Sequence, residues 1–210
     1  MAATCYFIKC LLSLFLFNGV LGSHVSSSYL AEKIQDLEKV VHRTSCQVYF
    51  ARGYRYEHMY PVDGLIFDNV DVEMKFGELN RFLMHFAIKG SKDAIIILTP
   101  TANPGSDDLV FEIVVGIDFG LVTVLRTKKE GLINIDEVAR VHTSHPIISP
   151  STYTDFYISL DNDVLKFGKK ASDPIITYFD VRLRQIKYFD MSCYGNYDAK
   201  FLFDCPAPYS

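Results

Sequence analysis

Two apolar runs separated by a short connection constrain the fold of this chain most strongly. Residues 109–116 read LVFEIVVG and residues 122–126 read VTVLR, and the connection carries glycine at positions 116 and 120. Valine, isoleucine and phenylalanine suit the pleated surface of a sheet, and glycine readily adopts the positive φ angles that a tight reversal requires. The two runs therefore predict a β-hairpin that reverses between Gly116 and Gly120.

Similar strand-like segments with turn residues between them continue along most of the chain. The segment 70–76 alternates apolar and charged residues, as expected of a strand with one solvent-exposed face. The other predicted strands are 47–51, 82–88, 94–98, 138–143, a hairpin within 156–168, 174–180, 186–190 and 199–203. Ten or more short strands, without helices alternating between them, predict an all-β fold: an antiparallel two-sheet, jelly-roll-like sandwich.

The N-terminus predicts the compartment and the domain boundaries. Residues 1–22 have a lone Lys9, an apolar stretch and small residues near position 22, which is the layout of a cleaved secretory signal peptide. The apolar stretch is shorter than the roughly 20 residues that span a bilayer, so we expect secretion and no membrane span. Apolar residues at near-helical spacing predict a short helix within 23–45, and the sandwich domain follows at 46–210.

The charge of the chain excludes one class of partner. The net charge of −4 and the scattered basic residues exclude the broad basic face that nucleic acids require.

Three cysteines remain after the signal: Cys46, Cys193 and Cys205. A hairpin at 195–196 would set Cys193 opposite Ala199, so Cys193–Cys205 fits poorly. Because first and last strands are often neighbours in a sandwich, we predict a Cys46–Cys205 disulfide, with Cys46–Cys193 as the alternative.

Two motifs and the strand order connect the chain to a known family. Residues 116–123 read GIDFGLVT where relatives read Gly-Gly-Trp-Gly-Asn-x-x-Ser, and residues 193–200 read CYGNYDAK where relatives read Gly-Trp-Gly-Ala-Thr-Gly-x-Trp. Over about 76–203, the chain resembles the animal domain family named after farnesoic acid O-methyltransferase, which is common in insects. The resemblance implies a β-sandwich, and the family name implies an enzyme of juvenile-hormone metabolism. This chain contains no tryptophan.

The residues themselves do not support that enzymatic activity. S-adenosylmethionine is usually held by a glycine-rich turn between a strand and a helix, and the chain has no G-x-G sequence. The catalytic patterns G-x-S-x-G and H-E-x-x-H are absent as well. We therefore expect no cofactor and a non-enzymatic protein, and keep the farnesoic acid methyltransferase as an alternative.

Two polar pairs contain residue types that bind metals. His142 and His145 lack an obvious third ligand, so we interpret them as surface histidines. Asp161 and Asp163 flank Asn162 in a cluster that could hold calcium, but these residues are also favoured in a hairpin turn with positive φ at 162 and 163. We therefore predict a turn and no metal.

Aromatic residues beside hydrogen-bonding side chains suggest recognition of a ligand. Tyr194, Asn196 and Asp198 form one such cluster, which also contains a tyrosine at 197, in a predicted loop. Tyr153 and Asp155 form another, near the start of a strand. Such groups suit a glycan, because an aromatic ring covers a sugar face while polar groups bond its hydroxyls. The candidate partners are thus a glycan or a protein, with a carrier of a small apolar ligand as an alternative, and the oligomeric state stays open.

Overall fold

The computed structural model describes residues 46–53, 59–64, 73–75, 77–105, 108–128, 135–195 and 197–204. All of them belong to one unit of the chain, Val41–Ser210. The predicted signal peptide at 1–22 and helix within 23–45 lie outside the described residues, as do Asn196 and Cys205.

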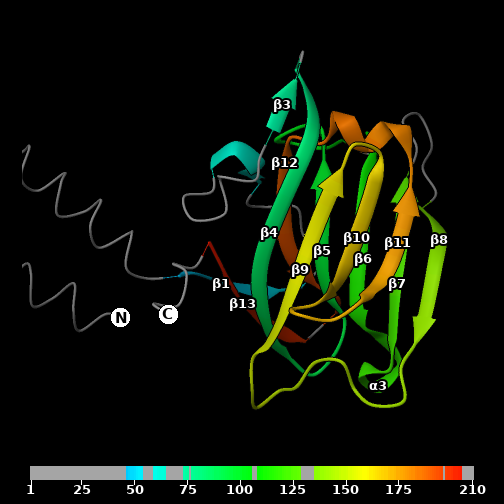
Figure 1. Ribbon diagram of the computed structural model, residues 1–210. Coiled ribbons are helices and arrows are strands. Elements are labelled where there is room, and N and C mark those ends of the chain that lie inside the picture. Colours follow the sequence, from blue (N-terminus) through cyan, green and yellow to red (C-terminus); the bar gives the residue numbers. More distant parts are fainter. Residues whose placement is uncertain are drawn as a thin grey trace, which may run out of the picture. The chain divides into compact units, whose positions relative to one another are not determined.

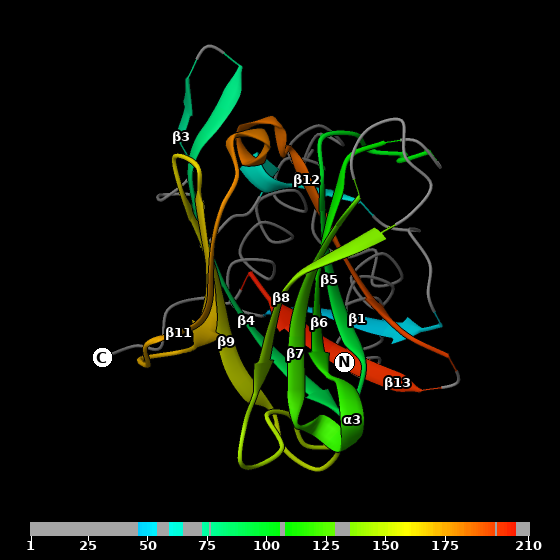
Figure 2. The same ribbon diagram turned by 90° about the vertical axis from the view of Figure 1, so that its right-hand side faces the viewer.

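Two antiparallel sheets stack face to face in this unit (Figures 1 and 2). The seven-stranded sheet has the order β1-β13-β4-β9-β10-β11, with β3 paired to β4. Its strands are β1 (Gln47–Arg52), β3 (Glu73–Lys75), β4 (Glu78–Gly90), β9 (Thr154–Asp161), β10 (Val164–Lys169), β11 (Pro174–Phe179) and β13 (Asp198–Phe203). The antiparallel two-sheet sandwich predicted from the sequence is confirmed.

The six-stranded sheet has the order β2-β12-β5-β6-β7-β8. Its strands are β2 (Tyr60–Pro61), β5 (Ala94–Thr99), β6 (Val110–Gly116), β7 (Val122–Lys128), β8 (Ile135–His142) and β12 (Tyr188–Cys193). The described residues also contain short helical turns: η1 (Val62–Gly64), α3 (Ile117–Gly120) and η3 (Val181–Gln185).

The predicted reversal at Gly116 and Gly120 is the α3 turn between β6 and β7. Gly116 has φ 85° and Gly120 has φ 88°, so both glycines occupy the left-handed region that favours glycine. Asp118 and Phe119 also have positive φ, which means that α3 is a turn and not a continuing helix. The register that follows sets Val114 opposite Val124 and the hairpin is confirmed.

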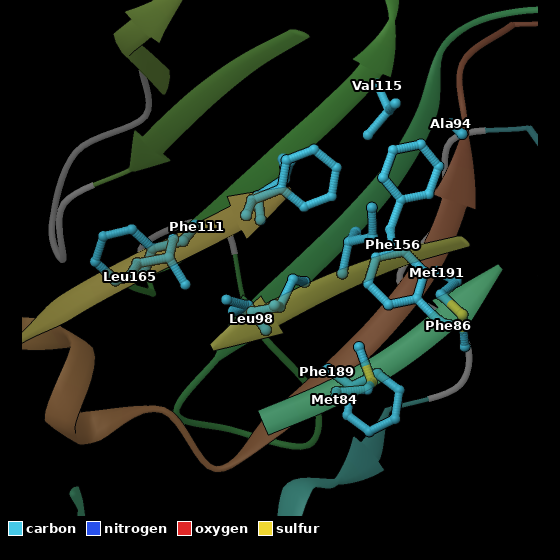
Figure 3. Packing of buried hydrophobic residues seen from close by; sticks show 14 of the residues in the cluster. Met84, Phe86, Ala94, Leu98, Phe111, Val115, Phe156, Leu165, Phe189 and Met191 are labelled. Carbon is cyan, nitrogen blue, oxygen red and sulfur yellow. The ribbon is translucent and has the colours of Figure 1, made fainter. Parts of the chain in front are cut away.

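Apolar side chains from both sheets fill the space between them (Figure 3). Phe156 of β9 and Phe167 of β10 stack at 5.3 Å between ring centroids, with 13° between their planes. Phe86 of β4 stacks on Phe156 at 6.0 Å, and Phe111 of β6 lies in the same cluster. Burial of each of these rings stabilises the fold by roughly 1.5–3 kcal/mol through transfer from water.

The segment after Cys193 differs from the expected hairpin at 195–196. β12 belongs to the six-stranded sheet and β13 to the seven-stranded sheet, so the chain crosses here from one layer to the other. β13 pairs instead with β4 on one side and with β1 on the other. The expectation that the first and last strands are neighbours is therefore confirmed, whereas the hairpin is wrong.

Candidate functional site

The outer face of the six-stranded sheet is mostly apolar and largely buried. β5 reads AIIILT, and every residue in it is buried, so both faces of the strand are covered. Ile96 and Leu98 point into the core between the sheets, while Ile95 and Ile97 belong to a second cluster on the opposite face. The other buried members of this second cluster are Val110, Val114, Val122 and Val124.

A row of polar side chains crosses this apolar face. The register aligns Asp190 of β12 with Ile97 of β5, then with Glu112 of β6 and Arg126 of β7. Glu112 is fully buried and forms an ion pair with Arg126 at 2.6 Å. Asp190 is also fully buried, and its Oδ1 accepts a hydrogen bond of 2.6 Å from the backbone N–H of Met191. The ion pair fixes the guanidinium group beside the apolar floor.

A hollow of about 250 Å³ opens at the end of this row. It is lined by Asp93, Ile95, Val114, Ile117, Arg126 and Tyr194. The backbone N–H of Tyr194 donates to the carbonyl of Asp93 at 3.1 Å, which ties the end of β12 to the turn before β5. Asp93 adopts φ 53°, the left-handed turn conformation that aspartate tolerates better than most residues. The local fold thus places an aromatic ring, a carboxylate and a guanidinium around one apolar floor.

The charged groups of the hollow retain capacity for a ligand. Burial raises the pKa of Asp93 above its ordinary value, although Lys92 and Arg126 oppose this effect. The Arg126 side chain is 28% exposed, so part of its guanidinium group is open to the hollow. Tyr194 is 59% exposed. The hollow therefore offers a hydrogen-bond acceptor, a charged donor and a ring face.

The structure divides the residues that the sequence grouped around Tyr194. Tyr194 lines the hollow just described, whereas Asp198 lines a different hollow beside the seven-stranded sheet. Tyr153 lies near this second hollow, because the Nζ of Lys89, which lines it, sits 5.8 Å from the centre of the Tyr153 ring. Asp155 is exposed on β9, and Asn196 is outside the described residues.

Asp93 and Arg126 were not among the residues predicted from the sequence. Arg126 could have been found from the sequence, because a hairpin that reverses between Gly116 and Gly120 sets it opposite Glu112. A charged pair inside two apolar strands is unusual. Asp93 had no such signal, because it joins the hollow only through the pairing of β5 with β12 from the far end of the chain.

Of the cysteines, Cys193 is a free, buried thiol. Its Sγ lies 2.7 Å from the carbonyl oxygen of Tyr197 and 3.3 Å from that of Ala51, and burial raises the pKa of the thiol. The alternative disulfide Cys46–Cys193 is therefore not formed. The Cys46–Cys205 disulfide stays a prediction, because Cys205 lies outside the described residues.

Asp161 and Asp163 lie in a hairpin turn and do not face a common site. Asp161 pairs with Val164 across a two-residue turn, in which Asn162 has φ 54° and Asp163 does not take a positive φ. Asp163 accepts two hydrogen bonds from Arg184, at 2.5 and 2.7 Å. Across the described residues no group of three or more histidine, cysteine, aspartate or glutamate side chains is arranged to hold a metal ion.

The fold and the hollow define an antiparallel β-sandwich with ligand-sized hollows on its outer surfaces. Residues 65–207 match the model of the family described as farnesoic acid O-methyl transferase, and the chain belongs to this family. No curated protein matches the sequence. None of the helices in the described residues has the length and apolar character needed to cross a membrane.

Several solved structures share a similar arrangement at low identity. Sheep galectin-11 in complex with glycerol is 15% identical, with a TM-score of 0.36, over 56% of this chain and 89% of the galectin. The carbohydrate-binding module CBM66 from Bacillus subtilis is 11% identical, with a TM-score of 0.37, over 60% and 73%. A β-glucanase from Bacillus licheniformis is 11% identical, with a TM-score of 0.41, over 75% and 95%.

Proposed function

We propose that this protein is a secreted, non-enzymatic recognition protein that binds a glycan in the hollow formed by Tyr194, Asp93 and Arg126. One observation carries the proposal: an exposed aromatic ring stands beside a carboxylate and a guanidinium over an apolar floor. A sugar presents an apolar C–H face and a rim of hydroxyls. The ring suits that face, while the carboxylate accepts from the hydroxyls and the guanidinium donates to them.

Secretion is supported by the N-terminal pattern of residues 1–22, which has the layout of a cleaved signal peptide. The predicted Cys46–Cys205 disulfide fits the same oxidising compartment. It is supported by the pairing of β1 with β13, in which Gln47 lies opposite Phe203; in the sequence, Cys46 comes one residue before Gln47 and Cys205 two residues after Phe203.

The alternative of a methyltransferase acting on farnesoic acid has less support. The glycine-containing segment Gly116 to Gly120 joins two antiparallel strands through a four-residue turn. A loop for S-adenosylmethionine would lead from a strand into a helix whose N-terminal N–H groups face the cofactor. The expected result of incubating the mature protein with S-adenosylmethionine and farnesoic acid is no methyl ester detectable by mass spectrometry.

The alternative of a carrier for an apolar ligand also has less support. Such a ligand would need space between the sheets, where the stacked rings of Phe86, Phe156 and Phe167 lie (Figure 3 shows the first two). Admitting a ligand there would require these well-packed rings to separate, at a cost of several kcal/mol.

A glycan-array screen of the oxidised mature protein tests the proposal. The Tyr194→Ala variant removes the ring, and Phe179→Ala is the matched control, since Phe179 is 65% exposed on β11 of the other sheet. We expect selective glycan binding by the wild type and by Phe179→Ala, and a loss of about tenfold or more in Tyr194→Ala, which corresponds to about 1.4 kcal/mol. An array without any selective binding, or equal losses in the two variants, would refute the glycan site. Mass spectrometry of molecules bound to the native protein would then test the carrier.

A further inference from the structure

A row of four residues crosses the outer face of the seven-stranded sheet. Phe50 of β1 pairs with Lys200 of β13, and Lys200 pairs with Lys89 of β4. The pairing of β4 with β9 then places Lys89 beside Tyr153, one residue before the start of β9. Three steps between adjacent strands give the row a length of about 14 Å.

The two lysines in the middle of this row lie opposite each other and direct their ammonium groups apart, toward the rings at the two ends of the row. Lys200 directs its Nζ over the ring of Phe50, at 5.0 Å from the ring centre, and Lys89 does the same over Tyr153 at 5.8 Å. Among the described residues, neither lysine forms an ion pair with a carboxylate, and Asp198, two residues before Lys200 on β13, pairs with Arg52 at 3.5 Å.

A hollow of about 320 Å³ opens beside these lysines. Its lining includes Lys89, Lys200, Ser91, Tyr197 and Asp198. A third lysine, Lys92, places its Nζ 4.2 Å from the centre of the Tyr197 ring. Two lysines thus line the hollow and a third lies against its Tyr197 ring, in a protein whose net charge is −4.

We propose that this row, Phe50-Lys200-Lys89-Tyr153, binds the sulfate groups of an acidic polysaccharide. A sulfate would pair with either ammonium group, neither of which pairs with a carboxylate among the described residues, and the row extends far enough to contact successive units of a polymer. This site lies on the other sheet from the hollow at Tyr194 and does not depend on it.

An anionic membrane surface is a different ligand with the same charge, and the structure favours it less. The two exposed rings, Phe50 and Tyr153, each lie beside an ammonium group, so inserting either ring among acyl chains would bring a charged group into the bilayer. A membrane would also face the acidic remainder of the protein, whereas a single polymer chain contacts only the row. Anionic vesicles therefore serve as a separate arm of the test.

The test measures the affinity of the oxidised mature protein for immobilised heparin, for chemically desulfated heparin, and for vesicles of phosphatidylcholine and phosphatidylserine. The double variant Lys89→Gln/Lys200→Gln removes both charges. The matched control is Lys166→Gln, since Lys166 is exposed on β10 of the same sheet, opposite Ser159 and Thr177. Tyr194→Ala separates this site from the glycan hollow.

We expect heparin to bind the wild type, and the double variant to bind at least tenfold more weakly, with a shallower dependence of affinity on salt. Lys166→Gln and Tyr194→Ala should bind within about twofold of the wild type, and desulfated heparin should bind weakly. The double variant also removes the contacts of the two ammonium groups with Phe50 and Tyr153, so its thermal midpoint is measured alongside, and affinities are compared well below that midpoint. The proposal is overturned if heparin does not bind, if Lys166→Gln loses as much affinity as the double variant, or if the vesicles are the preferred ligand.

Discussion

Replacement of Gly116 by alanine tests whether the reversal between β6 and β7 requires glycine for two separate reasons. Gly116 has φ 85°, and an added Cβ would lie 2.7 Å from Cδ1 and 2.9 Å from Cγ1 of Ile148, which is buried. The left-handed conformation costs a non-glycine residue about 1–2 kcal/mol. Overpacking a buried site costs about 1–3 kcal/mol more. Gly116→Ala should therefore lose about 2–5 kcal/mol of unfolding free energy.

Gly77→Ala is the matched control for the conformational cost. Gly77 has φ 80°, and nothing lies within 4 Å of its added Cβ, so only the first cost applies. Urea unfolding followed by tyrosine fluorescence is suitable, because the chain contains no tryptophan. We expect Gly116→Ala to be less stable than Gly77→Ala by about 1–3 kcal/mol. Ile148→Val removes the closest atom, so Gly116→Ala/Ile148→Val should be at least as stable as Gly116→Ala. Equal losses in the two glycine variants, or additive losses in the double variant, would refute the packing argument.

Three further perturbations follow from the same structure. Burial raises the pKa of the Asp93 carboxyl, so the folded protein favours the protonated form, and the stability that this form contributes is lost as the pH rises through the pKa. Asp93→Asn should therefore raise the thermal midpoint at pH 7 but not below pH 3.8, and it should weaken glycan binding. Hydrogen bonds from Arg182 lower the pKa of Asp180, which accepts a hydrogen bond from the backbone N–H of Arg182 at the start of η3. Asp180→Ala should lower the unfolding free energy in urea by about 1 kcal/mol at pH 7, and this loss should shrink as the pH falls below 3.8. Peptide mapping without reductant should recover Cys46 linked to Cys205, whose removal costs about 3–5 kcal/mol, while Cys193 resists alkylation until the protein unfolds.

The elements that the sequence predicted well depend on neighbouring residues. Glycine at 116 and 120 and the Asn162 turn are local signals, because a positive φ restricts which residue can occupy one position. The strands between these turns followed from their composition. Even the pairing of the first and last strands could be expected, since it is a common arrangement in sandwiches.

The features that the sequence did not reveal depend on pairing between distant strands. A turn at Gly195 is compatible both with a hairpin and with a crossing between sheets, and only the partners of β12 and β13 distinguish the two. The separation of Tyr194 from Asp198 follows from that crossing. The contact of Tyr194 with Asp93 and the pairing of Lys89 with Lys200 likewise join residues from opposite ends of the domain.

The segment that crosses between the sheets contributes to both proposed sites. Tyr194 lines the hollow on one sheet, and Tyr197 lines the hollow on the other. In the family pattern that residues 193–200 resemble, tryptophans stand at the positions of Tyr194 and Lys200. The first change keeps an aromatic ring beside Asp93, which suits a sugar face. The second exchanges an indole for an ammonium group that lies over Phe50 and opposite Lys89, and this exchange turns a neutral aromatic position into one that favours an anion. The two changes therefore agree with the two ligands proposed above, a neutral glycan at one end of the crossing and a sulfated chain at the other.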